Sequence, residues 1–421
     1  MRKRQNTIQV SLDNEQTLYF MNVSIGTPAQ DLHMHLDTGS SDLWVNTPSS
    51  QLCSSNNGNA CAASGAYTAN DSSTYDYLNG DFNITYVDGS GSAGDYVTDT
   101  VRFSNIELQR QQFGIGYTSS SQEGIIGIGY PINEVAVAYN GGRPYSNVPD
   151  HLMQTGQINS NAYSLWLNDL QASTGSILFG GVNTDKYTGQ LQTLPIIPEQ
   201  GVYAEFIIAL TAVGANGTDG SIASNIAVPA LLDSGSSLMY LPDNIAYDIY
   251  NSLGAVYDES QAAAFVDCSL ADSDSTLDLT FSSPTIRVGM DELVIVAGVD
   301  RGQPICILGI GPAGGSTPVL GDTFLRSAYV VYDITGNTIS LAQTAFNVTT
   351  SNILEINNGT NAVPSASAVA NAVTSLSVQT GGARIDGQPT AVSSAFAAPT
   401  ASNIGYSAAL VGALGAAVYA L

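Results

Sequence analysis

The chain has 421 residues, of which only 11% are charged. Its 36 acidic side chains outnumber 11 basic ones, which gives a formal net charge of −25 at pH 7. This balance argues against nucleic-acid binding, which needs basic surface patches. It suits an acidic environment, because few cations remain to repel one another once the carboxylates are protonated. The length exceeds that of one ordinary hydrophobic core and favours two lobes.

Short runs of β-branched and aromatic residues, separated by Gly, Asn, Asp and Ser, fill the sequence from about residue 7 to residue 347. This pattern predicts a mainly β protein. The expected strands include 18–25, 82–87, 163–167, 177–179, 329–332 and 338–342. Helical periodicity is scarce. The best candidate is 244–253, where Ile245, Ile249 and Leu253 fall on one face.

One short phrase occurs twice. Leu-Asp-Thr-Gly-Ser-Ser at 36–41 returns as Leu-Asp-Ser-Gly-Ser-Ser at 232–237. Each copy is followed, at almost the same spacing, by two apolar residues and a glycine, at 125–127 and 319–321. Two motifs repeated in the same order indicate two related lobes, each of which supplies half of a site.

The repeated aspartates, Asp37 and Asp233, are the predicted catalytic pair. Two carboxylates in close contact cannot both ionise easily, so one can accept a proton from water while the other polarises a peptide carbonyl. Gly39 and Gly235 follow because each loop must turn sharply and bring backbone N–H groups to the carboxylate. The alternative, two unrelated surface Asp-x-Gly turns, does not explain the common register.

These motifs resemble those of the pepsin-family aspartic endopeptidases, in particular the fungal candidapepsin-like and yapsin-like members that carry a glycosylphosphatidylinositol (GPI) anchor. Further matches occur at 19–20, 25–28, 84–86 and 319–326, and the resemblance covers roughly residues 15–347. It implies a bilobal pepsin-like fold with two related β lobes and the active-site cleft between them. It also implies a monomer that hydrolyses polypeptide substrates, with no cofactor and no metal.

The resemblance also implies roles for the residues around the aspartates. Thr38 and Ser234 are expected to brace the two loops against each other. Ser40 and Ser236 are expected to hydrogen-bond the outer carboxylate oxygens.

A β-hairpin flap is expected over 86–92, with Tyr86 paired to Trp44 and with Asp88, Gly89 and Ser90 near the substrate. A Gly- and Ser-rich tip between strands suits a lid. Family members commonly have Gly after the Tyr, and Val87 at that place predicts a stiffer tip. The alternatives are an ordinary exposed hairpin and a calcium loop over 88–95, whose spacing does not follow the EF-hand pattern.

Four cysteines, two in each half, indicate disulfides and an oxidising compartment. Three pairings are possible. The duplication and the family pattern favour Cys53 with Cys61 and Cys268 with Cys306. A zinc site is disfavoured because the sequence has no Cys-x-x-Cys and only three histidines.

Sequons for N-glycosylation agree with secretion. The candidates are Asn70, Asn216, Asn347 and Asn358, whereas Asn22 and Asn83 lie in strand-like runs.

His33 and His35 alternate along one strand and therefore share a face. This placement could suggest a metal site, but no third ligand is evident, so packing or a surface position is expected instead. Asp322 is interpreted as structural.

By resemblance, residues 1–4 form a basic pro-segment junction, 5–188 the N-terminal lobe and 189–347 the C-terminal lobe. The Ser-, Thr- and Ala-rich segment 348–403 predicts a flexible stalk. The apolar segment 404–421 is shorter than the roughly 20 residues that span a bilayer. It predicts a GPI-attachment signal, with attachment in 394–403 and display at the cell surface; membrane contact would then be through the lipid anchor alone.

The resemblance predicts a secreted aspartic-type endopeptidase that is active at acidic pH. The rival interpretations are a catalytically inactive cell-wall or binding protein that reuses the fold, and an adhesin built on the stalk. The two intact Asp-hydroxyl-Gly triplets favour the enzyme. The choice between basic and broader cleavage sites stays open.

Overall fold

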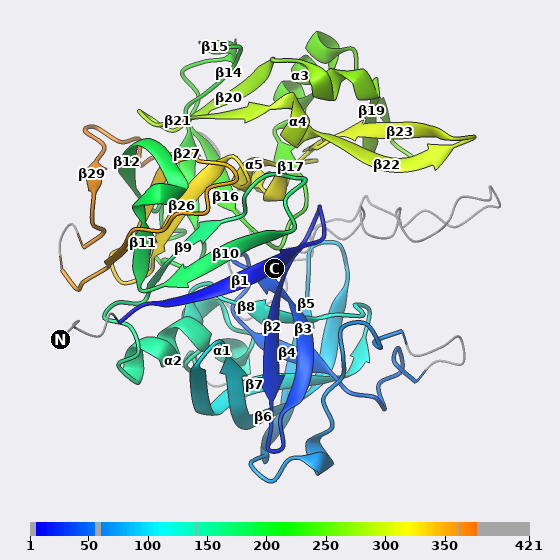
Figure 1. The fold of residues 1–421 in the computed structure, drawn as a ribbon, viewed down its shortest axis with the longest axis vertical. Helices are drawn as coiled ribbons and strands as arrows, with labels where there is room; N and C mark the ends of the chain where they lie inside the picture. Colours follow the sequence, from blue (N-terminus) through cyan, green and yellow to red (C-terminus); the bar gives the residue numbers. More distant parts are fainter. Residues whose placement is uncertain (1–5, 55–59, 140, 360–361, 377–421) are drawn as a thin grey trace.

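The computed structural model describes residues 6–54, 60–139, 141–359 and 362–376. Figure 1 shows two β-rich lobes, one built mainly from the first part of the chain (blue to cyan) and the other from the later part (green to yellow). The predicted mainly β, two-lobed architecture is confirmed.

The elements follow one another with short connections. The first half contains β1 (Ile8–Asn14), β2 (Tyr19–Ile25), β3 (Gln30–Asp37), β4 (Leu43–Asn46), β5 (Asp76–Thr85), β6 (Gly91–Phe103), β7 (Ile106–Ser119), β8 (Gly124–Gly127), α1 (Ala136–Tyr139), α2 (Val148–Gln154), β9 (Ala162–Trp166), β10 (Thr174–Phe179), β11 (Gly181–Asn183) and β12 (Tyr187–Pro195). The second half contains β13 (Ile207–Leu210), β14 (Ala212–Ala215), β15 (Thr218–Ala223), β16 (Val228–Leu232), β17 (Met239–Leu241), α3 (Asp243–Leu253), β18 (Val256–Asp258), β19 (Ala263–Val266), β20 (Thr276–Thr280), β21 (Thr285–Gly289), α4 (Met290–Leu293), β22 (Val294–Asp300), β23 (Gln303–Leu308), β24 (Ile310–Pro312), β25 (Val319–Leu320), α5 (Asp322–Leu325), β26 (Ala328–Asp333), β27 (Thr338–Thr344), β28 (Ile353–Glu355) and β29 (Ala366–Ala368).

A long sheet connects the two lobes. Within the described ranges its 14 strands lie in the order β29-β12-β27-β26-β9-β10-β1-β2-β3-β8-β4-β7-β6-β5. The halves meet at β9, which pairs with β10 on one side and with β26 on the other. The lobes therefore share backbone hydrogen bonds, and the predicted boundary between residues 188 and 189 falls inside β12.

The repeated sequence phrases correspond to a repeated local arrangement. β3 lies parallel to β8, which lies antiparallel to β4, and β4 lies parallel to β7. In the second half β16 lies parallel to β25, which lies antiparallel to β17, and β17 lies parallel to β24. Each half thus presents its Asp-containing loop from the same kind of four-strand unit.

The helix expected over 244–253 is confirmed as α3. Ile245, Ala246, Ile249 and Tyr250 are its buried face. The helix ends at Gly254, whose φ of 68° is the left-handed conformation that glycine adopts easily at helix C-termini.

Both predicted disulfides are confirmed. Cys53 is bonded to Cys61 and Cys268 to Cys306, with Cα atoms 5.2 Å apart in each pair. The second bridge ties the one-turn helix at 268–272 to β23.

The segment after residue 348 differs from the expected flexible stalk. β28 pairs with β11, β29 pairs with β12, and the side chains of Ile356 and Val363 are buried. The expectation was wrong for the described residues up to 376, because these few apolar side chains and the free edges of two strands provide partners. Residues 377–403, the rest of the expected stalk, and the predicted anchor signal at 404–421 lie outside the described residues.

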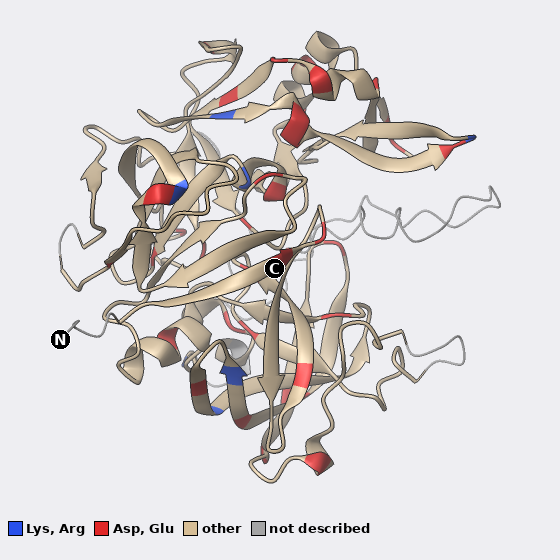
Figure 2. Ribbon diagram, in the orientation of Figure 1, with Lys and Arg blue, Asp and Glu red and all other residues tan. Residues whose placement is uncertain are grey.

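Acidic side chains are scattered over both lobes, and basic ones are sparse (Figure 2). No helix in the described part of the chain is both long enough and apolar enough to cross a membrane.

Candidate active site

The two motif aspartates lie at the ends of equivalent strands. Asp37 is the last residue of β3, where it pairs with Gly127 of β8, and Asp233 directly follows β16. Both side chains are fully buried. Because each strand lies beside a parallel apolar neighbour, its end is fixed in position and the Asp-containing loop begins at a defined point.

Each carboxylate is held by its own loop in the same way. The Gly39 N–H donates to Asp37 Oδ1 at 2.7 Å, and the Gly235 N–H donates to Asp233 Oδ1 at 2.8 Å. The Ser236 hydroxyl donates to Asp233 Oδ2 at 2.7 Å, and the Ser40 hydroxyl donates to Asp37 Oδ2. The inner and outer oxygens of both carboxylates are thus oriented by charge-assisted hydrogen bonds.

The two glycines are needed because the loops approach each other closely. A Cβ atom on Gly39 would lie 2.5 Å from Asp233 Oδ1, and one on Gly235 would lie 2.4 Å from Asp37 Oδ1. Any side chain at either position would collide with the carboxylate of the opposite lobe. The contact of the two aspartates depends on this missing atom.

Thr38 and Ser234 join the two loops. The Thr38 hydroxyl donates to the Leu232 carbonyl at 3.0 Å, and the Ser234 hydroxyl donates to the Leu36 carbonyl at 2.9 Å. Each hydroxyl also accepts the backbone N–H of the other residue, at 3.2 Å for Thr38 N–H and 2.9 Å for Ser234 N–H. Four buried hydrogen bonds therefore fix one lobe to the other directly beside the carboxylates.

A β-hairpin lies over 76–103, with its turn at 86–90 between β5 and β6. Tyr86 is buried at the base of this turn, and its hydroxyl oxygen accepts the Trp44 indole N–H at 2.7 Å. In the turn, the Ser90 N–H donates to Asp88 Oδ1 at 2.8 Å, and Gly89 has a φ of 81°. The structure thus brings Tyr86 and Trp44 together and leaves the tip, with Val87, Asp88 and Gly89, exposed.

A family model described as "Eukaryotic aspartyl protease" matches residues 18–344. The chain belongs to this family. It is an aspartic-type endopeptidase, a hydrolase.

Three relatives illustrate the range of the similarity. "Probable aspartic-type endopeptidase opsB" of Aspergillus oryzae is 56% identical over 393 residues, which cover 92% of this chain and 80% of the relative. "Secreted aspartic protease 3" of Candida albicans is 38% identical over 361 residues, which cover 83% of this chain and 85% of the relative. The crystal structure of an aspartic proteinase from Irpex lacteus has a TM-score of 0.68 at 23% identity and covers 82% of this chain and all of that one; this similarity concerns the fold alone.

In this protease the charge on Asp233 is disfavoured. Burial, and then the neighbouring Asp37 carboxylate, raise the pKa of Asp233 well above its ordinary value, although hydrogen bonds from Ser236 and Gly235 oppose the shift. A carboxyl that keeps its proton beside a second carboxyl can act as an acid, as paired-carboxylate chemistry requires.

A second buried carboxyl pair lies below the hairpin, and no motif in the sequence pointed to it. Asp42 accepts the hydroxyls of Tyr96 at 2.6 Å and Tyr145 at 3.0 Å, and the Val135 N–H at 2.8 Å. Glu134 accepts the Tyr145 N–H at 2.7 Å. Burial, and then Asp42, raise the pKa of Glu134 well above its ordinary value.

Asp322 lies at the start of α5 and is fully buried. Neither of its carboxylate oxygens has a hydrogen-bond partner among the described residues. Burial raises the pKa of Asp322 well above its ordinary value, against the lowering effect of Arg326. Arg326 itself is buried and paired with Glu292 at 2.5 Å. The sequence had indicated only a structural role for Asp322.

The two histidines of β3 lie in different surroundings. His33 stacks on Phe20 with ring centroids 4.5 Å apart, and its Nε2 lies 3.4 Å from Asp13 Oδ2. His35 is buried beside the second Asp-containing loop. Within the described ranges, no three His, Cys, Asp or Glu side chains are arranged to hold a metal ion.

The four candidate glycosylation residues, Asn70, Asn216, Asn347 and Asn358, are all exposed. Asn22 and Asn83 are exposed as well, although they lie within β2 and β5.

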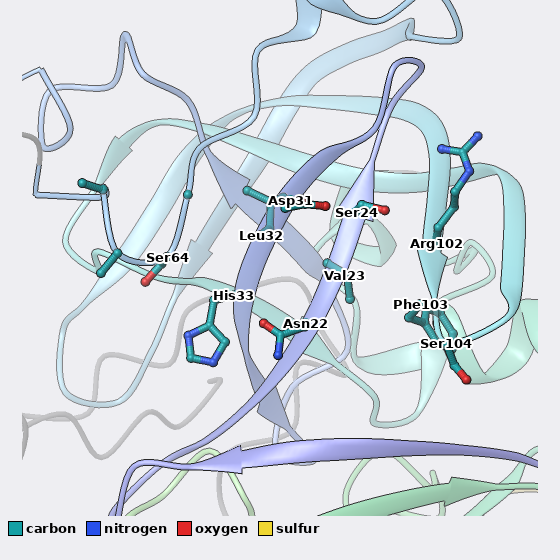
Figure 3. A pocket seen from close by; sticks show the side chains of 13 residues that line it. Asn22, Val23, Ser24, Asp31, Leu32, His33, Ser64, Arg102, Phe103 and Ser104 are labelled. Atoms are coloured by element: carbon teal, nitrogen blue, oxygen red, sulfur yellow. The ribbon is translucent and has the colours of Figure 1, made fainter.

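A separate cavity of about 580 Å³ lies on the first lobe (Figure 3). Asn22, Asp31, His33, Ser64 and Arg102 line it, from β2, β3, β6 and the loop before residue 65. Neither aspartate of the pair borders this cavity, so we assign it no part in peptide hydrolysis.

Proposed function

We propose that Asp37 and Asp233 hydrolyse peptide bonds of polypeptide substrates at acidic pH by activating a water molecule between them. The observation that carries the proposal is the two-fold related contact of two buried carboxylates, each with the same set of donors. No cofactor enters this mechanism.

The ionised carboxylate accepts a proton from the water, and the resulting hydroxyl attacks the peptide carbonyl carbon. The protonated carboxyl gives its proton to the carbonyl oxygen, so that a tetrahedral diol forms without a free oxyanion. When the C–N bond breaks, a proton passes to the leaving amine and the two carboxyls exchange their roles. The N–H donors of Gly39 and Gly235 stabilise whichever carboxylate is charged at each step.

The test is digestion of an unfolded protein by the purified protease between about pH 3 and pH 7, with the products identified by mass spectrometry. We expect cleavage at internal peptide bonds, inhibition by the transition-state mimic pepstatin, and no effect of metal chelators. Loss of activity on chelation, or cleavage that resists pepstatin, would exclude the mechanism. The same digest of a peptide library would give the cleavage-site preference.

We further propose that the hairpin with Tyr86, Asp88, Gly89 and Ser90 closes over the substrate. Tyr86→Phe removes the oxygen that accepts the Trp44 N–H and leaves a buried donor unpaired. We expect kcat/KM for a peptide substrate to fall by about 5- to 100-fold, since a small displacement of a closing lid is costly. Steady-state kinetics measure the effect, with Tyr77→Phe, an exposed position on β5, as the matched control. Equal kinetics in the two variants would refute the flap assignment.

We also propose that the protease is secreted and attached to the cell surface by a GPI anchor. The secreted Candida albicans relative, the two disulfides and the composition of residues 377–421 support this proposal. Phosphatidylinositol-specific phospholipase should release the protein from intact fungal cells. A form that ends after Leu376, which keeps β28 and β29, should appear in the medium in active form. Retention of that form on membranes would contradict the anchor.

A further inference from the structure

His35 adds a contact between the lobes that the sequence motifs did not reveal. It lies two residues before Asp37 on β3, and its side chain is buried. Its Nε2 lies 3.3 Å from the carbonyl oxygen of Ser234, in the loop of the opposite lobe. A carbonyl oxygen can only accept, so Nε2 carries the proton and donates the hydrogen bond.

The same peptide group also holds the second aspartate. The oxygen of the Ser234–Gly235 peptide accepts from His35, and its N–H, which belongs to Gly235, donates to Asp233 Oδ1 at 2.8 Å. Hydrogen bonds in a chain polarise one another, so a donor at the oxygen makes the N–H a stronger donor. His35 is therefore connected to the Asp233 carboxylate through a single peptide group.

This contact breaks the two-fold symmetry of the site. The hydrogen bonds of Thr38 with the opposite loop have equivalents in those of Ser234. The residue equivalent to His35 is Leu231, two positions before Asp233, and its side chain has no donor. Within the described ranges, the peptide that supports Asp233 thus has a side-chain donor that the repeat does not supply for Asp37.

The surroundings keep His35 a neutral donor in mild acid. Burial lowers the pKa of His35 below its ordinary value, against the raising effects of Asp37 and Glu123. The residues that pair with it on the neighbouring strands are uncharged, Phe20 on β2 and Ile125 on β8.

We infer that His35 is a positioning residue for the reaction: it fixes the Ser234–Gly235 peptide, strengthens the Gly235 donor to Asp233 and makes the two aspartates inequivalent. This inference rests on the proposed function of the pair.

The experiment compares His35→Leu, which installs the residue found in the other half, with His35→Gln, whose amide Nε2 can still donate. His33→Gln, on the same face of β3, is the control. For His35→Leu we expect kcat to fall by about 2- to 12-fold, as for one lost hydrogen bond, with little change in KM. Both limbs of its pH–kcat/KM profile should move to higher pH, because the charged form of Asp233 has lost a stabilising donor. His35→Gln should recover most of the rate and the original profile.

A His35→Leu profile that superimposes on the wild-type profile would overturn the inference, as would equal losses in the Leu and Gln variants. An independent readout does not require activity. Nitrogen NMR of ¹⁵N-histidine-labelled protein, which has three histidines, should show His35 as the Nε2–H tautomer. The Nδ1–H tautomer would refute the inference even if the wild type were active. An inactive wild type with the expected tautomer would refute the proposed function of the pair instead.

Discussion

Replacing either Asp37 or Asp233 by Asn is expected to abolish peptide hydrolysis, with kcat falling by about 10⁴-fold or more. Asn keeps the shape of Asp and can still accept from Gly39 or Gly235, so the loops should stay in place. It cannot accept the proton of the attacking water or share a proton with its partner. Turnover of a chromogenic peptide by the purified variants measures the loss.

Several controls make this result specific. Asp248→Asn, an exposed position on α3, should retain wild-type activity. The double variant should be little worse than either single one, since groups that act as a unit lose their function together. Circular dichroism and thermal unfolding should show folded variants. Single variants that keep wild-type turnover would end the two-aspartate interpretation.

The pair also predicts the pH dependence of the wild-type rate. Activity should fall at low pH when both carboxyls are protonated and at high pH when both are ionised. The raised pKa of Asp233 shifts the upper limb above the ordinary range of an aspartate.

The second large effect concerns stability: the folded protein should become less stable as the pH rises from about 4 toward 7. Burial and Asp42 raise the pKa of Glu134 in the folded state. An acid whose folded pKa is raised contributes its full stability below the unfolded pKa, and this contribution is lost as the pH rises toward the folded pKa. One such group costs at most about 1.4 kcal/mol per pH unit. Asp322 should act in the same direction.

Glu134→Gln tests this linkage. The amide stays neutral at every pH and can still accept the Tyr145 N–H. We expect urea unfolding to show a free energy of unfolding that declines less steeply with pH in this variant, so that it exceeds the wild type at pH 7 by more than at pH 4. Glu259→Gln, in an exposed turn after β18, should leave the slope unchanged. A parallel pair of curves for wild type and Glu134→Gln would show that this carboxyl does not cause the decline.

The sequence was informative where chemistry requires fixed local spacing. Asp37 and Asp233 were found because each belongs to a repeated phrase, and α3 because its apolar residues recur at helical intervals. The Tyr86–Trp44 contact came from the family resemblance, and so did the choice among the three disulfide pairings.

Other features depend on contacts that local patterns do not encode. Asp42 and Glu134 are far apart in the sequence, and only the fold places both carboxyls in one apolar layer. The stalk prediction counted Ser and Ala, whereas the structure depends on Ile356 and Val363 and on two unpaired strand edges. For His35, comparison with Leu231 in the second half would have shown that the two halves differ beside the site.

The two ends of the long sheet matter for solubility in acid. Near pH 4 the 36 acidic side chains lose much of their charge, so mutual repulsion no longer keeps molecules apart. A long straight edge strand would then be a template for aggregation. One edge is β29, only three residues long, and the other is β5, where two register shifts interrupt the pairing with β6. Colloidal stability at the working pH is thus provided by the shape of the sheet edges, and removal of β29 would leave β12 open to association with other molecules.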